Sequence, residues 1–370
     1  MHNLMGKGVH KFLPNMAWRE SLLAPERHDI YLDWMRGLAA MAVFVSHLRG
    51  GFFVKWADLD SSSQNLTNFI LFSLTRLGRE SVVVFFVLSG YLVGGNALHR
   101  AMDGDFSVRR YAIARIARLY PVLVPALFLT AFFDSLHIQA STVSLGVRPF
   151  FVNLFFLNGI LGPSFGSNAP LWSLAYEWWY YVAFGAGLFA AMSIRARKKI
   201  AVASSVVVLC TALFIMSGPM FALFPLWLLG ALARATPRRP SVSLAALATF
   251  TLLIAIAVST SLWNLFGDYL VGFATFGFIC AIKNQPPLEA QWSRVGTTLA
   301  AFSYTLYAVH YPINYFTEEL LHPNRLRHAG IAQWTSLVII GAGIILICYG
   351  WYWLFERQSP RFRRWLEARV

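Results

Sequence analysis

Residues 331–355 read IAQWTSLVIIGAGIILICYGWYWLF, a run without a single charged side chain. A helix needs about 20 mostly apolar residues to cross the hydrocarbon core of a bilayer. Comparable runs recur along the chain, near 31–49, 69–97, 118–137, 171–192, 199–217, 219–234, 242–260, 263–282 and 297–316. The pattern predicts an all-α integral membrane protein with about ten transmembrane helices. A further apolar stretch, PFFVNLFFLNGI at 149–160, has only about half the length of a span and is expected to be re-entrant or interfacial.

The composition agrees with a lipid-facing surface. Of 370 residues, 57% are hydrophobic and 13% are charged, whereas about a quarter are charged in an ordinary soluble domain. The net charge of +14 is concentrated in short basic clusters between apolar runs, so it does not indicate nucleic-acid binding. This composition excludes a soluble nucleic-acid binder, a disordered chain and a secreted disulfide scaffold. The three cysteines lie in apolar runs without metal-ligand spacing, so neither a disulfide nor a metal site is expected.

The basic clusters also predict an orientation. They follow every second predicted span and include Arg100, Arg109, Arg110, Arg195, Arg197, Lys198, Lys199, Arg234, Arg238 and Arg239. Because cytoplasmic loops carry an excess of Lys and Arg, both termini are expected in the cytoplasm. We expect a cytoplasmic N-terminal tail at 1–30, one transmembrane domain at 31–355 and a basic cytoplasmic tail at 356–370.

The first predicted span carries ionisable residues on one helical face. Arg36 and His47 are eleven residues apart, which is close to three full turns and about 16 Å along the axis. Asp33 precedes Arg36 by three residues and shares this face. One interpretation is an interfacial Asp33–Arg36 pair with His47 at the end of the span. Ionisable residues inside a membrane helix are costly and usually functional, which favours a functional site.

A carboxylate stands alone in the predicted span that begins LWSLAYEWWYYVAF (171–184). An aromatic belt explains the neighbouring rings, but it does not explain Glu177. His47 and Glu177 are expected at similar depth near the outer side of the membrane. The hypothesis is that Glu177 orients His47 and that His47 acts as a general base.

Three other segments have two interpretations each. In RRYAIARIARLYP (109–121), Arg115 and Arg118 share one helical face, either as a positive-inside anchor or as a cradle for the phosphates of a cytoplasmic ligand. Ser89 lies in a small-residue segment that favours close helix packing. His310 precedes a proline near the end of its span, and a structural, hydrogen-bonded histidine is the simpler interpretation.

Taken together, these segments resemble the acyltransferase-3 family of membrane acyltransferases. The first-span pattern of Arg36 and His47 is similar to the arginine–histidine pattern of that family, and the other similar motifs are FFVLSGYL (85–92), the arginine pair of 115–118, WSLAYEWWYY (172–181) and SYTLYAVHYPI (303–313). The chain departs from the family pattern at Ser81, Val83 and Trp178, where a small or acidic residue is common.

The resemblance implies transfer of an acyl group, most often acetyl from acetyl-CoA, to a hydroxyl of a glycan, a lipid-linked sugar or a small hydrophobic acceptor. It implies catalytic roles for His47, Glu177 and Arg36, and contacts of the donor with Arg115, Arg118 and Asp33. A covalent acyl-histidine intermediate is the alternative mechanism. Contact with the acceptor, or support of the site, is expected from Ser89, Ser173, Tyr180 and His310. Acyl-CoA would be a co-substrate rather than a resident cofactor, and the expected location is a bacterial inner membrane.

A different functional class fits the same polar residues. A transporter or flippase could use His47, Glu177 and Arg36 as a proton or substrate relay. Such proteins commonly contain inverted repeats, and no internal repeat is evident in this sequence. A degenerate relative that serves as a membrane scaffold is a third hypothesis, and the presence of every candidate polar residue argues against it.

Overall fold

The computed structural model describes residues 29–136, 144–236, 242–262, 264–283, 285, 288–321 and 324–369. All regular secondary structure in these ranges is helical, which confirms the predicted all-α class. The predicted N-terminal tail lies outside the described residues apart from its last two positions, and so do Arg238 and Arg239.

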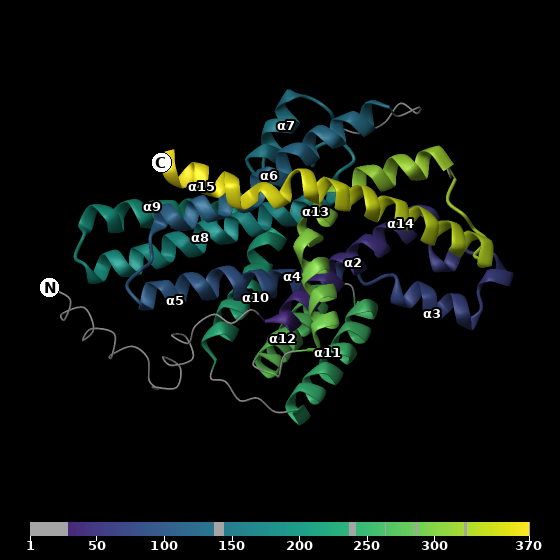
Figure 1. Cartoon of the computed structure of the whole chain (residues 1–370), viewed down its shortest axis with the longest axis horizontal. Helices are drawn as coiled ribbons and strands as arrows, with labels where there is room; N and C mark the ends of the chain where they lie inside the picture. Colours follow the sequence, from purple (N-terminus) through teal and green to yellow (C-terminus); the bar gives the residue numbers. More distant parts are fainter. Residues whose placement is uncertain are drawn as a thin grey trace. The chain divides into compact units, whose positions relative to one another are not determined.

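Each of the ten predicted ranges contains helix in its described residues. The main helices are α2 (Ile30–Phe52), α3 (Leu66–Leu74), α4 (Gly78–Ser89), α5 (Asn96–Met102), α6 (Val108–Ser135), α7 (Val147–Leu154), α8 (Trp172–Arg195), α9 (Lys199–Ile215), α10 (Gly218–Ala235), α11 (Val242–Leu262), α12 (Leu265–Ile282), α13 (Ala290–Leu321), α14 (Ile331–Leu354) and α15 (Ser359–Arg369) (Figure 1). A π-helical turn, η4 (Gly90–Gly95), joins α4 to α5.

The expected count of about ten membrane spans is not confirmed. In the described part of the chain, six helical stretches are long and apolar enough to cross a membrane: Leu66–Met102, Val108–Ser135, Gly218–Ala235, Ser243–Thr260, Leu265–Ile282 and Ile331–Arg369. Helix α9 is apolar but shorter. The helices α2, α8 and α13 carry most of the candidate site residues, and these polar and charged side chains lower their hydropathy.

At three places the helix boundaries differ from the predicted ranges or define them more closely. The predicted span at 69–97 is not one regular helix, because α3 ends at Leu74 and α4 begins at Gly78. The stretch at 149–160 contains only the eight-residue helix α7, which is too short to cross a bilayer. The expected C-terminal tail is helical in η6 (Glu356–Gln358) and α15, and Glu356 is buried.

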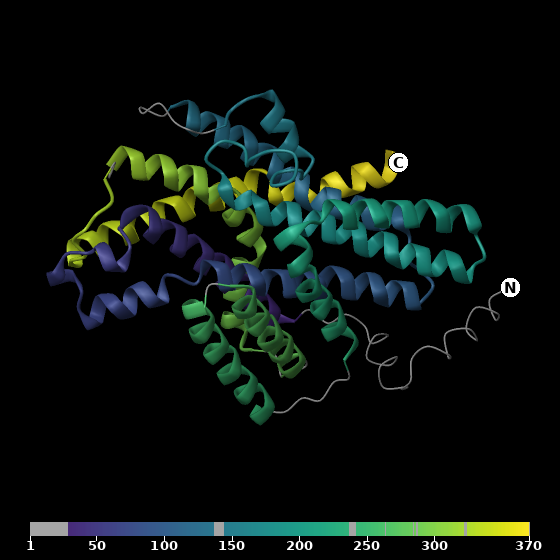
Figure 2. The ribbon, with the colours of Figure 1, turned by 180° about the vertical axis from the view of Figure 1, so that it is seen from behind.

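The chain divides into two compact units, which are described separately. Of the described residues, the first unit contains those within 29–32, 83–115 and 176–293, and the second contains those within 33–82, 116–175 and 294–369. In the first unit, α11 and α12 lie side by side in both views of the molecule (Figures 1 and 2).

Close helix packing in the first unit depends on two glycines. A Cβ atom at Gly90 would lie 1.8 Å from the Trp227 carbonyl oxygen, and one at Gly230 would lie 1.9 Å from the Val87 carbonyl oxygen. No side chain fits at either position. The glycines therefore let the end of α4 and the π-helical turn η4 rest directly on the backbone of α10.

The second unit is built around α13. Its residues Leu306, Ala308, Val309 and His310 are almost completely buried. Helix α2 packs closely against α13 at Gly37, where a Cβ atom would lie 2.6 Å from the Leu299 Cβ atom. The same helix approaches α14 at Gly341, where a Cβ atom would lie 2.8 Å from Leu48. Helix α2, with Arg36 and His47, is thus fixed against both neighbours.

Candidate functional site

Two histidines meet inside the second unit. The Nδ1 atom of His47 on α2 lies 2.9 Å from the Nε2 atom of His310 on α13. Their ring planes are nearly parallel, at 8° to each other, and the ring centroids are 5.2 Å apart. Tyr311 places its ring edge-on to His47 at 5.1 Å. His310 is therefore hydrogen-bonded, as the simpler interpretation predicted, and its partner is the candidate base.

The hydrogen bonds assign the protons of this pair. The Nδ1 atom of His310 lies 2.7 Å from the Leu306 carbonyl oxygen, which can only accept, so Nδ1 carries the hydrogen. In neutral His310 the Nε2 atom then accepts, and the donor must be the Nδ1–H group of His47. Two neutral rings suit the burial of both side chains. The Nε2 atom of His47 is left with a lone pair, which is the form required of a general base.

Backbone chemistry of α13 supports this arrangement. Pro312 has no N–H group, so the Ala308 carbonyl lacks its helical partner. The Nδ2 atom of Asn168 donates to this carbonyl at 2.9 Å. The Tyr307 hydroxyl donates to the Pro170 carbonyl at 2.8 Å and contacts the Ser173 hydroxyl. Ser173, a predicted supporting residue, thus helps to hold the segment before α8 against α13.

A charged cluster lies at the other end of α2. Arg36 and Asp33 form an ion pair at 3.4 Å, and Arg36 also interacts electrostatically with Arg118 and Glu356. Arg118 is paired with Glu356, which is only 2% exposed in its side chain. The second unit therefore brings three predicted residues together, namely Asp33, Arg36 and Arg118.

Glu356 joins this cluster to α13. Its Oε2 atom accepts hydrogen bonds from the Thr305 backbone N–H at 3.0 Å and from the Thr305 hydroxyl at 2.6 Å. Its Oε1 atom accepts from Arg118. Both oxygens of this buried carboxylate thus accept hydrogen bonds, one from α6 and the other from α13. Sequence reasoning assigned Glu356 to a tail and missed it.

The first unit holds a second polar network. The Trp227 indole donates to the Ser89 hydroxyl at 3.1 Å, and the Ser89 and Tyr181 hydroxyl oxygens are 3.1 Å apart. The Tyr181 hydroxyl donates to the Oε1 atom of Glu177. A tyrosine has one hydroxyl hydrogen, so Ser89 donates to Tyr181. The network is directional and ends on the Glu177 carboxylate.

Arg115 lies beside this network. Its guanidinium group is 5.5 Å from the centre of the Tyr181 ring and 5.8 Å from that of Tyr111. Its Nε atom is buried without a hydrogen-bond partner among the described residues. Tyr180, another predicted supporting residue, has a different role, because its buried hydroxyl donates to the Met220 carbonyl at 2.7 Å and anchors α8 to α10.

Several predicted relationships join the two units and stay predictions. His47 lies in the second unit and Glu177 in the first, so the predicted His47–Glu177 pair is not tested. Arg115 and Arg118 fall on either side of the division, three residues apart in α6.

Some of the site residues that the sequence analysis missed have a local sequence signal, and others have none. Tyr181 is four residues after Glu177 on one helix, a spacing that places the two side chains together. Pro312 likewise predicts an unpaired carbonyl at Ala308, although nothing local names Asn168 as its donor. The hydrogen bond between His310 and His47 depends on the packing of α13 against α2. The spacing of residues within a motif does not predict this packing.

A comparison with protein families bears on the whole membrane region. Residues 29–355 match the acyltransferase domain that defines one family of membrane enzymes. The chain belongs to the acyltransferase-3 family. The match includes every predicted site residue, and it ends one position before Glu356.

Two curated relatives of the family match parts of the chain. An uncharacterised protein of Haemophilus influenzae is 29% identical over 113 residues, which are 27% of this chain and 45% of that protein. A candidate peptidoglycan O-acetyltransferase of Bacillus subtilis is 31% identical over 196 residues, which are 49% of this chain and 27% of that protein. The chain thus aligns with less than half the length of either relative. No solved structure matches the chain.

Proposed function

We propose that this protein is a membrane-embedded O-acyltransferase. It would move an acyl group, acetyl in the simplest case, from cytoplasmic acyl-CoA to a hydroxyl of a glycan or lipid-linked sugar. Family membership supports the reaction class, and the relative from Bacillus subtilis is named for acetyl transfer to peptidoglycan. The observation that carries the mechanism is the His47–His310 hydrogen bond, because it leaves the Nε2 atom of His47 able to accept a proton.

The proposed reaction balances with these groups. The Nε2 atom of His47 takes the proton of the acceptor hydroxyl while that oxygen attacks the thioester carbonyl. The carbon–sulfur bond then breaks, and the departing CoA thiolate receives the proton from His47. An O-ester and free CoA are the products. His310 keeps the Nδ1–H hydrogen of His47 engaged throughout, so the cation that forms transiently on His47 is stabilised by a hydrogen bond.

The donor side of the proposal uses the arginines. Guanidinium groups bind phosphates through two parallel hydrogen bonds, and CoA carries three phosphate groups on its nucleotide end. Arg115 and Arg118 would bind these phosphates. Arg36, held by Asp33 and close to Arg118 and Glu356, would lie along the path of the donor toward His47. In this account Glu177 lines the reaction site and is ordered by Tyr181 and Ser89.

The proposed orientation of the protein in the membrane is inferred from the positions of the basic clusters. Arg115, Arg118 and the C-terminal helix would face the cytoplasm, with both termini on that side. The acceptor would reach His47 from the opposite side of a bacterial inner membrane.

The test is a transfer assay with purified protein in lipid. Radiolabelled acetyl-CoA and a cell-envelope extract are supplied to the wild type, His47→Ala and Arg115→Ala. We expect alkali-labile label in a sugar or lipid fraction with the wild type only. Folded His47→Ala protein that transfers label at the wild-type rate would refute the assignment of the base. Folded wild type that neither binds acetyl-CoA nor transfers label would refute the reaction and favour a transporter.

A further inference from the structure

Three arginines converge at the end of α2, next to the turn that carries His47. Arg49 on α2 experiences electrostatic repulsion from Arg76 and from Arg325. Arg76 lies in the turn between α3 and α4, and Arg325 lies between α13 and α14. All three belong to the second unit. Like charges are brought together here by three separate segments of the chain.

The position of Arg325 is fixed by backbone pairing. The Leu326 N–H donates to the Phe52 carbonyl at 2.8 Å, and the Val54 N–H donates to the Leu326 carbonyl at 3.1 Å. Arg325 therefore lies directly beside the end of α2. Its Nε atom also donates to Glu318 at 3.1 Å.

Gly51 brings this pair close to the candidate base. A Cβ atom at Gly51 would lie 2.5 Å from the Oε2 atom of Glu318, so this carboxylate lies directly against the last turn of α2. Gly51 follows His47 by four residues and is on the same helical face, one turn further along. The Glu318–Arg325 pair thus lies one turn beyond His47.

Glu318 balances the charge of Arg325, but no carboxylate balances the charge of Arg49 in this way among the described residues. In the same part of the chain, the Nε atom of Arg49 is buried without a hydrogen bond. Its guanidinium group lies 5.0 Å from the centre of the Phe72 ring. A snorkelling arginine would place its nitrogens in water, which does not account for the buried Nε atom. A bound anion would balance the charge of Arg49 and offset its repulsion by Arg76 and Arg325.

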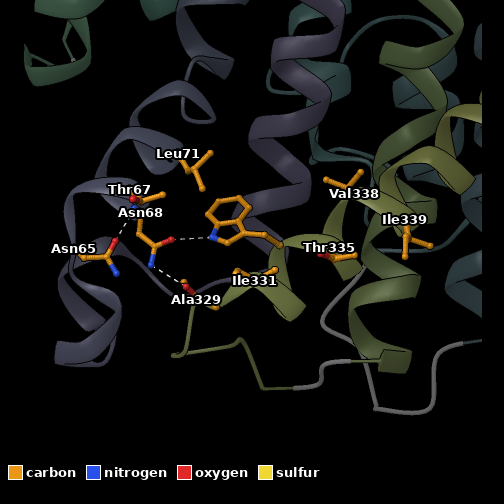
Figure 3. A pocket seen from close by; sticks show the side chains of 11 residues that line it. Asn65, Thr67, Asn68, Leu71, Ala329, Ile331, Thr335, Val338 and Ile339 are labelled. Carbon is orange, nitrogen blue, oxygen red and sulfur yellow. Dashed lines mark hydrogen bonds between the residues drawn. The ribbon is translucent and has the colours of Figure 1, made fainter.

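An apolar pocket begins on the other side of the same aromatic ring. Phe72 packs edge-on against Trp334 with ring centres 5.8 Å apart. Trp334 lines a pocket of about 650 Å³ between the starts of α3 and α14 (Figure 3). Leu71, Val338 and Ile339 form its apolar wall.

Two polar side chains of the pocket wall, Asn68 and Trp334, are already hydrogen-bonded. The Trp334 indole donates to the Oδ1 atom of Asn68 at 2.9 Å, and the Nδ2 atom of Asn68 donates to the Ala329 carbonyl at 2.8 Å (Figure 3). Hydrocarbon and ring surface from Leu71, Ile331, Trp334, Val338 and Ile339 makes up most of the rest of the pocket lining. Such a surface suits a hydrocarbon chain.

We propose that Arg49, Arg76 and Arg325 bind the phosphate group of a lipid whose hydrocarbon chain lies in the pocket between α3 and α14. A cationic cluster near an apolar pocket, with the rings of Phe72 and Trp334 between them, is complementary to an amphiphile with an anionic head. Guanidinium groups in a cluster favour phosphate because its several oxygens accept more than one pair of hydrogen bonds. If this lipid is the acyl acceptor, the acceptor is carried on a lipid phosphate. That part of the proposal rests on the acyl transfer proposed above.

Binding can be measured without turnover, so the two proposals can fail separately. The full-length protein is placed in phosphatidylcholine nanodiscs with saturating CoA, so that the proposed donor site is occupied. The probes are farnesyl phosphate, farnesol and inorganic pyrophosphate. The variants are Arg49→Gln, Thr335→Trp, which narrows the pocket, and Arg327→Gln as a control, because Arg327 is an exposed arginine of the same segment facing Asp60.

We expect farnesyl phosphate to bind the wild type at least tenfold more tightly than farnesol or pyrophosphate does. Arg49→Gln should weaken farnesyl phosphate binding by roughly tenfold to a hundredfold, the usual effect of removing a charged hydrogen bond. Thr335→Trp should weaken it as well, and Arg327→Gln should leave it unchanged. Equal binding by the wild type and Arg49→Gln would overturn the phosphate site. Pyrophosphate binding as tight as that of farnesyl phosphate would overturn the role of the pocket.

Discussion

The Nδ1 atom of His47 lies 2.9 Å from the Nε2 atom of His310, and the Nδ1 atom of His310 lies 2.7 Å from the Leu306 carbonyl oxygen. This chain of contacts starts at a backbone carbonyl, which can only accept, and therefore fixes a direction for both hydrogens. The consequence is a His47 side chain whose outer nitrogen is unprotonated. His310 is thus the observed hydrogen-bond partner of His47, whereas the predicted pairing of His47 with Glu177 stays a prediction.

Removing the acceptor nitrogen of His310 should impair catalysis more than folding. In His310→Phe the ring can still pack edge-on against Phe44, but the hydrogen bond from His47 is lost. We expect kcat to fall by roughly tenfold to a hundredfold, as for other partners that orient a functional histidine, with little change in the KM for acetyl-CoA. The measurement is steady-state kinetics of CoA release at varied acetyl-CoA, beside a thermal-unfolding scan.

Tyr311→Phe is the matched control for that variant, since it keeps the ring that faces His47. It should retain activity to within a factor of about two or three. A His310→Phe protein with wild-type kcat would show that the pair is only a packing contact.

Glu356 should matter for stability and for donor binding. Its carboxylate accepts from Thr305 and Arg118, so Glu356→Ala removes the buried acceptor of the Thr305 hydroxyl. A buried group that loses its hydrogen bond costs about 1–3 kcal/mol, and we expect a lower unfolding temperature. Because Arg118 loses its anchor, the KM for acetyl-CoA should rise as well.

Glu356→Gln separates these two effects. The amide can still accept from Thr305, so the unfolding temperature should recover in part, while the charge that holds Arg118 is absent. The variants are compared by thermal unfolding in lipid and by CoA binding. Unchanged unfolding temperature and CoA affinity in both variants would rule out this role for Glu356.

The contact between η4 and α10 should tolerate no side chain at Gly230. In Gly230→Ala the new Cβ atom would lie 1.9 Å from the Val87 carbonyl oxygen, so the two helices must separate. We expect loss of folded protein, measured by the yield of monodisperse material in detergent. Gly350→Ala on α14 is the control, because no atom lies within 4 Å of its added Cβ atom. Equal yields from both variants would contradict the close packing.

Local patterns predicted much of this molecule. Apolar run lengths located a helix in every predicted range, and helical periodicity placed Asp33 beside Arg36, where the ion pair is observed. The spacing of WSLAYEWWYY also contained the Glu177–Tyr181 contact, four residues apart. These features depend on neighbours in the chain, which a sequence displays directly.

The unpredicted features depend on contacts between distant segments. His310 meets His47 across 263 positions, and Glu356 meets Thr305 across 51 positions. Helix packing, not spacing, brings these pairs together. The break between α3 and α4 was also missed, because the span was assigned from its overall apolar length, although Arg76, Arg79 and Glu80 interrupt the apolar run at this point. The predicted number of about ten spans is not confirmed, because only six helical stretches in the described part of the chain are long and apolar enough to cross a membrane.

The most direct test of the central claim is chemical rescue of the base. Purified His47→Ala in lipid is assayed for transfer of labelled acetyl groups from acetyl-CoA, with and without added imidazole, beside the wild type. General-base catalysis contributes roughly 10²–10⁴ in rate, so we predict a loss of that size and partial recovery that increases with imidazole concentration. Transfer at the wild-type rate by a folded His47→Ala protein would contradict the account.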